Sequence, residues 1–180
     1  MTWTAPPVDR TEQPRLPGER EALDTALDFQ RQTLLMKCAG LDAEQLKRRA
    51  IPPSSLSLLG LVRHLAGVER WWFRQNFAGQ QLGDIYSYER TPDAEFDEVD
   101  DADPAADLAI YEAEVELARR ATAGHDLDET FMRATHALLP GRQPVELNLR
   151  WVYVRLIAEY ARHNGHADLL RQRIDGATGD

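Results

Sequence analysis

Four segments of the sequence repeat apolar residues at the three-and-four spacing of an α-helix, and short breaks separate them. They cover residues 19–39, 55–77, 104–124 and 148–174. Strand-like alternation is weak throughout the chain, and four amphipathic helices can bury their apolar faces only against one another. The pattern therefore predicts an all-α fold, a four-helix bundle.

The breaks between these segments carry recognisable helix-end signals. Ser55 or Ser57 can cap the second helix after the Pro52-Pro53 pair, and Asp103-Pro104 supplies a cap and a first-turn proline for the third. Glycines can end the first, third and last helices, at Gly40, Gly124 and Gly176.

Two stretches between the helices have no helical period. Residues 78–103 contain Gly79, Gly83 and a crowd of acidic residues, so a long solvated loop is expected between helices two and three. Residues 125–147 are mixed, and the Pro140-Gly141 pair indicates a turn that a short irregular hairpin could surround.

The chain is expected to form one domain behind an extended N-terminal arm. Residues 1–18 carry four prolines among polar side chains, which prevents a continuous helix, and residues 19–176 hold all four helical segments. A chain of 180 residues suits a single hydrophobic core.

Charge and cysteine content exclude several classes of partner. The formal charge of -9 argues against binding nucleic acid or an anionic membrane, because both attract basic surfaces. No apolar run approaches the roughly 18 residues that span a bilayer, and no leader pattern is present. Cys38 is the single cysteine, which excludes an internal disulfide and fits a reducing, cytoplasmic location. Its apolar neighbours favour a buried structural role over a nucleophilic one.

Ionisable residues stand in the middle of two expected core seams. On the last helix the seam runs Leu149, Val152, Leu156, Glu159, His163, His166 and Leu170, and on the second it runs Ser57, Leu61, His64, Val68 and Trp71. Burying such groups unpaired is costly, and one divalent cation could satisfy His64, Glu159 and His163 together. Two histidines and a glutamate leave a coordination position open, as in catalytic zinc sites.

Two simpler interpretations compete with the metal. Glu159 could form a buried ion pair with one histidine, or the register could be off by one residue, which would place the histidines at the helix edge. His166 lies one turn beyond His163, where it could orient a ligand or act as an acid or base.

Two motifs resemble the DinB-like superfamily. They are LLGLVRHLAGVERWWF at 58–73 and EYARHNGHADLLR at 159–171. More narrowly, they look like the actinobacterial mini-circle branch that is related to mycothiol-dependent S-transferases. The resemblance implies a four-helix bundle with a metal at one end, and the histidine, glutamate and histidine pattern of mycothiol-dependent maleylpyruvate isomerase implies that His64, Glu159 and His163 are the ligands.

The resemblance also implies an activity. A metal-dependent transferase would activate a low-molecular-weight thiol, mycothiol or a similar one, for attack on a small electrophilic substrate, with detoxification or isomerisation as the outcome. His166 is the candidate catalytic residue for moving a proton. Zinc is the expected metal, with nickel or another transition metal as alternatives, and a homodimer is expected. A metal-dependent hydrolase and a non-catalytic metal-binding stress protein are the competing functions.

Overall fold

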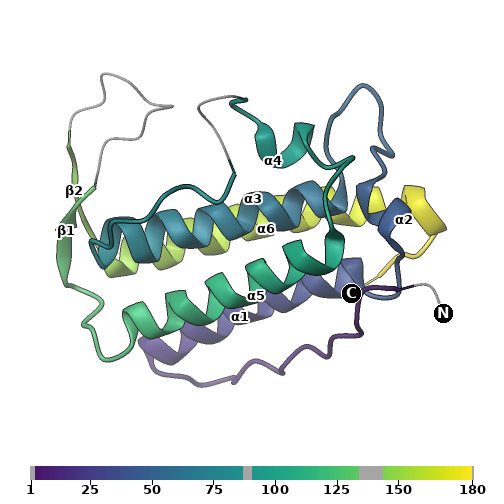
Figure 1. Cartoon of the computed structure of the whole chain (residues 1–180). Helices are drawn as coiled ribbons and strands as arrows, with labels where there is room; N and C mark the ends of the chain where they lie inside the picture. The colour runs from purple at the N-terminus through teal and green to yellow at the C-terminus, as the bar shows by residue number, and fades with distance from the viewer. Residues whose placement is uncertain (1–2, 87–90, 134–143, 180) are drawn as a thin grey trace.

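The computed structural model describes residues 3–86, 91–133 and 144–179, and it is mostly helical, as predicted. Four long helices lie side by side (Figure 1). They are α1 (Glu19–Cys38), α3 (Leu58–Glu69), α5 (Pro104–Thr122) and α6 (Leu149–Asp175). The π-helical stretch η1 (Arg70–Phe77) continues α3 directly. α1 packs against α6, whereas α3 packs against both α5 and α6.

The predicted end signals act as expected. The Ser57 hydroxyl accepts a hydrogen bond from the Gly60 amide over 3.0 Å, and the Asp103 carboxylate accepts one from the Ala105 amide over 3.0 Å. Each satisfies an amide that the first helical turn leaves unpaired. Past the end of α6, Gly176 adopts φ +82°, a left-handed conformation that glycine tolerates best.

Two short helices lie in stretches where no helix was predicted. α2 (Ala43–Lys47) begins with a capping box, in which Asp42 and Gln45 exchange hydrogen bonds between side chain and backbone. α4 (Ala94–Asp97) lies within the stretch that was predicted to be a solvated loop. That prediction is wrong for this part of the stretch, because Phe96 and Val99 belong to the main core and Ala94 is buried as well.

A small antiparallel sheet precedes α6. β1 (Thr130–Met132) pairs with β2 (Glu146–Asn148), and Thr130 lies opposite Asn148. The sheet agrees with the expected hairpin, although the expected turn at Pro140-Gly141 lies outside the described residues.

The N-terminal arm pairs with the segment that connects α1 to α2 and then contacts α1. The Ala5 amide donates to the Leu41 carbonyl over 2.9 Å, and the Gly40 amide donates back to the Ala5 carbonyl over 2.9 Å. Cys38 lies close by in the same core, 1% exposed, and burial raises the pKa of its thiol to about 12. This agrees with the predicted structural role.

The buried face of α6 differs from the predicted seam. Between Leu156 and Leu170 the buried residues are Tyr160, Asn164 and Ala167, so Glu159, His163 and His166 lie at the border of the buried face. The buried positions step by four residues from Leu156 through Tyr160 to Asn164, whereas the predicted seam steps by three from Leu156 to Glu159. A helix with 3.6 residues per turn returns to one face after either step. The departure is confined to the middle of α6, because Leu170 is buried as predicted.

No helix among the described residues is long and apolar enough to cross a membrane.

The packing of α4 on α3 depends on Gly60. A methyl group added at Gly60 would lie 2.7 Å from Phe96 Cδ1, and the Phe96 ring stacks on His64 with centroids 5.4 Å apart. We expect Gly60→Ala to lower the free energy of unfolding by about 1–3 kcal/mol, because Phe96 must move in a packed core.

Urea unfolding followed by circular dichroism measures this effect. Gly165→Ala is the matched control, since nothing lies within 4 Å of the added methyl group in α6. It should stabilise the protein by about 0.5–1 kcal/mol through helix propensity. Equal stability of the two variants would show that α4 does not pack tightly over Gly60.

Candidate metal centre

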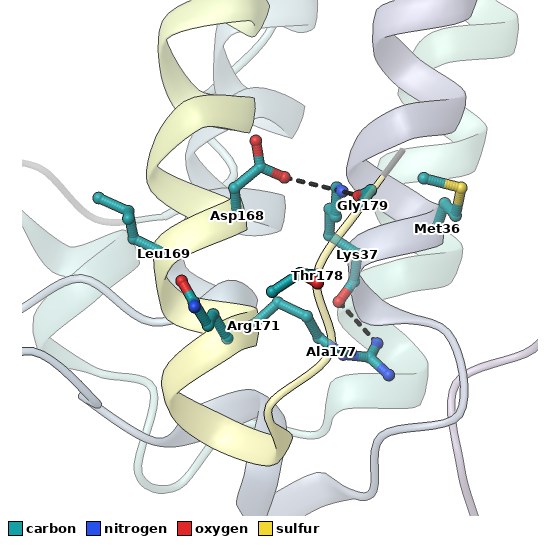
Figure 2. A pocket seen from close by; sticks show the side chains of 9 residues that line it. Met36, Lys37, Asp168, Leu169, Arg171, Ala177, Thr178 and Gly179 are labelled. Carbon is teal, nitrogen blue, oxygen red and sulfur yellow. Dashed lines mark hydrogen bonds and ion pairs between the residues drawn. The ribbon is translucent and has the colours of Figure 1, made fainter.

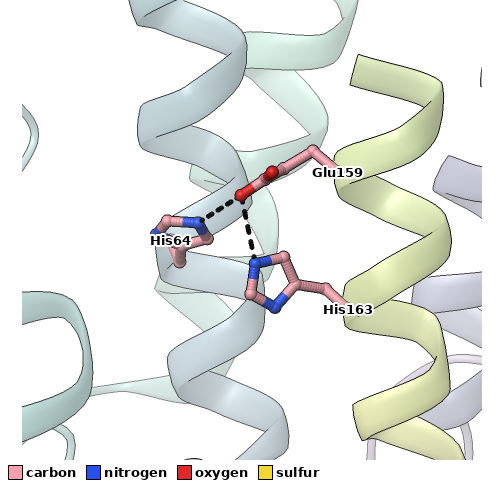
Figure 3. A group of neighbouring side chains, drawn as sticks. All are labelled: His64, Glu159 and His163. Atoms are coloured by element: carbon pink, nitrogen blue, oxygen red, sulfur yellow. Dashed lines mark hydrogen bonds and ion pairs between the residues drawn. The ribbon is translucent and has the colours of Figure 1, made fainter. Parts of the chain in front are cut away.

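Three of the sequence-predicted site residues meet between α3 and α6. His64 comes from the middle of α3, and Glu159 and His163 lie one turn apart on α6 (Figure 3). One ligand atom from each lies within 4.8 Å of the others, so the cluster could hold a metal ion.

The Glu159 carboxylate lies between the two imidazoles. Its Oε1 atom is 3.5 Å from His64 Nε2 and 3.3 Å from His163 Nε2. The other oxygen, Oε2, accepts a hydrogen bond from Arg155 Nη1 over 2.8 Å. Arg155 therefore occupies one carboxylate oxygen and leaves Oε1 directed at the histidines.

The charges of the cluster suit both an ion pair and a divalent cation. The imidazoles of His163 and then His64 hold the pKa of the Glu159 carboxyl well below its usual range. Burial opposes protonation of His64, but the carboxylates of Glu159 and Glu95 outweigh it and raise the pKa of His64 to about 8. Charge alone does not choose between the two interpretations.

A buried nitrogen without a hydrogen bond favours the cation. His64 Nε2 is buried and forms no hydrogen bond with the described residues, and its ion-pair contact with Glu159 Oε1 is long, at 3.5 Å. Such an atom costs free energy unless it finds a partner. The donor set of two imidazole nitrogens and one carboxylate oxygen matches zinc and related transition metals. The His64 side chain is 22% exposed and that of Glu159 is 12% exposed, so the cluster is sheltered but accessible.

Glu95 contacts the cluster from the side opposite Glu159. Its Oε1 atom lies 3.1 Å from His64 Nδ1, and the Glu95 side chain is only 6% exposed. Sequence analysis missed this residue because it placed the whole acidic stretch in solvent. The neighbouring Phe96 and Val99, both buried, were the available signal.

His166 lies behind His163, on the side away from Glu159. Its Nδ1 atom is 3.4 Å from His163 Nδ1, whereas Glu159 faces His163 Nε2. Burial, followed by the nearby charges of His163 and Arg162, lowers the pKa of His166. His166 therefore contacts the cluster at His163.

A separate cavity lies between the end of α1 and the end of α6 (Figure 2). It has a volume of about 430 Å³ and shares no lining residue with the histidine cluster. Its buried cation, Lys37, already pairs with Asp168 Oδ1 over 2.7 Å and donates to the Gly179 carbonyl. The charge in this cavity is therefore satisfied from within the protein.

Comparison with known proteins identifies one family. The family model described as mycothiol S-transferase matches residues 22–176, which include every residue of the cluster. No curated protein and no solved structure matched the chain.

Proposed function

Because the chain belongs to the mycothiol S-transferase family, we propose that it joins a low-molecular-weight thiol to a small electrophilic substrate at a divalent metal. His64, Glu159 and His163 would hold that metal. The thiol would be mycothiol or a close relative, and zinc is the first metal to test. A DinB-like four-helix bundle, a homodimer and a cytoplasmic location are parts of the same proposal.

The observation that carries the proposal is the convergence of one ligand atom from each of three residues, together with a His64 Nε2 atom that is buried and has no hydrogen-bond partner among the described residues. A structural zinc site in a protein is normally closed by four side chains, whereas three leave a position for substrate. A bound divalent metal would supply the positive charge that lowers the pKa of a thiol.

Neighbouring side chains orient two of the proposed ligands, Glu159 and His163. Arg155 holds Glu159 Oε2, so that Oε1 alone faces the site. His166 contacts the distal nitrogen of His163 and is suited to fix the orientation of that ring. We expected His166 to move a proton, and its place behind His163 favours the positioning role.

The proposed reaction needs only the thiol and the electrophilic substrate. The thiolate sulfur forms a bond to an electrophilic carbon, and either a leaving group departs or a carbon–carbon double bond takes up the electron pair and a proton. The thiol proton goes to solvent or to the leaving group. Neither redox partner nor nucleotide is required.

The test is turnover against a panel of electrophiles, with and without mycothiol, followed by mass spectrometry of the conjugate. We expect product only when both thiol and metal are present. We also expect the turnover rate of His64→Ala to fall at least 100-fold, because loss of a metal ligand should cost more than the roughly 10–100-fold typical of losing an outer hydrogen-bond partner. His125→Ala is the control, because His125 lies on the surface beside Glu129.

Two outcomes would replace the proposal. Activity without any thiol would favour the metal-dependent hydrolase, in which the same ligands activate water. Bound metal with no turnover in any assay, and unfolding on chelation, would favour a metal that only stabilises the helices.

A further inference from the structure

The buried carboxylate of Glu95 is hydrogen-bonded to the side chain of the candidate metal ligand His64. The Glu95 residue is 5% exposed and lies on α4, which packs on α3. Its Oε1 atom is 3.1 Å from His64 Nδ1. The imidazole thus has one nitrogen toward Glu95 and the other toward Glu159.

A neighbouring arginine could have paired with this carboxylate and does not. The guanidinium of Arg63, also buried, donates to the Glu95 main-chain carbonyl over 3.0 Å and to Asp107 Oδ2 over 2.9 Å. A third donation reaches the Ala94 carbonyl over 3.4 Å. Arg63 therefore anchors the backbone of α4 and leaves the Glu95 carboxylate to His64.

The second carboxylate oxygen of Glu95 also indicates that the carboxylate is placed for His64. Oε2 is buried and has no hydrogen-bond partner within the part of the chain that the structure describes. A carboxylate buried for structural stability is normally satisfied at both oxygens. Here the only oxygen that forms a hydrogen bond within the described residues contacts His64, so the carboxylate is positioned to hold the imidazole ring of His64.

We propose that Glu95 is a positioning residue for the metal centre. Its carboxylate accepts a hydrogen bond from the Nδ1–H group of His64, which selects the tautomer whose Nε2 carries a free lone pair and fixes the ring toward Glu159. Arg63 holds α4 at the distance that this contact requires. The inference rests on the metal in the proposed function, and it adds a residue from the acidic stretch to that site.

The physical reason lies in the electronics of the ring. A carboxylate hydrogen-bonded to one imidazole nitrogen increases the basicity of the other and prevents rotation of the ring. Loss of such an outer partner typically weakens metal binding about 10–100-fold. The amide oxygen of glutamine at the same position would still accept the hydrogen bond but would lack the charge, so it should retain part of the effect.

The experiment measures zinc affinity by competition with a chromophoric chelator in wild type, Glu95→Ala and Glu95→Gln. We expect a loss of about 10–100-fold in Glu95→Ala and a smaller loss in Glu95→Gln. Asp97→Ala is the matched control: it removes an equal charge from an exposed position on the same short helix and should leave the affinity unchanged.

Two further readouts separate positioning from structural support. Cobalt(II) absorption bands report ligand geometry, and we expect them to change in Glu95→Ala. Urea unfolding of the metal-free variants reports stability alone. Unchanged zinc affinity and cobalt bands, with only the metal-free stability reduced, would overturn the inference and make Glu95 a link between α4 and α3. A wild type that binds no zinc would instead overturn the metal centre itself.

Discussion

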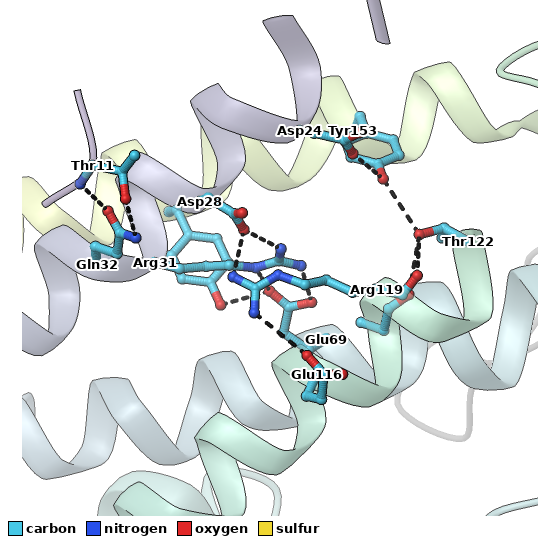
Figure 4. A network of polar contacts seen from close by, with 12 residues as sticks. Thr11, Asp24, Asp28, Arg31, Gln32, Glu69, Glu116, Arg119, Thr122 and Tyr153 are labelled. Atoms are coloured by element: carbon cyan, nitrogen blue, oxygen red, sulfur yellow. Dashed lines mark hydrogen bonds and ion pairs between the residues drawn. The ribbon is translucent and has the colours of Figure 1, made fainter. Parts of the chain in front are cut away.

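Replacing Glu69 by alanine is expected to lower the free energy of unfolding by about 3–5 kcal/mol, because it removes the buried counter-ion of a buried guanidinium and leaves only the more exposed Asp28. Glu69 on α3 accepts two hydrogen bonds from Arg31 on α1, over 2.8 Å and 2.7 Å (Figure 4). The two side chains are 0% and 6% exposed. Tyr160 of α6 donates to the same carboxylate over 2.7 Å. One carboxylate therefore joins three helices in the core.

Urea unfolding followed by circular dichroism measures the loss, and Asp28→Ala is the matched control. Asp28 also pairs with Arg31, over 2.9 Å, but its side chain is 33% exposed. An ion pair in contact with water contributes only about 0–1 kcal/mol, so this variant should stay close to wild type. Equal stability losses in the two variants would contradict the distinction between buried and exposed partners.

A double variant separates the cost of an orphaned charge from the net contribution of the pair. Arg31→Met with Glu69→Leu removes both charges and fills the space with apolar atoms. Replacement of buried ion pairs in this way is often neutral or stabilising by about 1–4 kcal/mol. We therefore expect the double variant to recover most of the loss. A double variant as unstable as Glu69→Ala would mean that the geometry of the pair is needed for packing.

The helices could be predicted because their signals are local. Ser57, Asp103 and Gly176 act within one turn of the residues they cap, and the apolar period of each long helix is visible in a short window. The capping box of α2 was equally local, with Asp42 three residues before Gln45, and it was overlooked because the helix has only five residues.

The residues that sequence analysis missed depend on contacts between distant segments. Glu69 and Arg31 are separated by 38 positions, and nothing in either helix distinguishes them from exposed charges. Glu95 lies 31 positions from His64 in an acidic stretch, where solvent is the usual environment. Their burial follows from how α1, α3 and α4 pack, and the apolar Phe96 and Val99 beside Glu95 are the local indication of it.

The candidate site was predicted from spacing, and its details required the structure. His64, Glu159 and His163 were proposed as a group, and they do lie together. Glu159 and His163 lie at the border of the buried face of α6, because that face runs through Tyr160 and Asn164. A border position leaves one side of the cluster accessible, which a site for substrate requires and a fully buried seam would not provide.

Metal binding is expected to vanish in His64→Ala and in Glu159→Ala, whereas wild type purified without an affinity tag holds about one equivalent. Each variant removes one of three ligand atoms that lie within 4.8 Å of one another. The remaining pair cannot enclose the ion, so affinity should fall by more than the roughly 100-fold that marks the loss of an outer partner. Elemental analysis after dialysis measures the metal content directly.

Stability provides an independent measurement of the same site. A metal present at 100 times its dissociation constant stabilises the folded state by about 2.7 kcal/mol if it binds only that state. We expect this gain in wild type and in the surface control His125→Ala, and none in the two ligand variants. Full metal content in both ligand variants would place the ion elsewhere. A wild type that neither holds nor takes up metal would identify the cluster as a buried ion pair, because the interaction of Glu159 with His64 and His163 can account for the cluster without a cation.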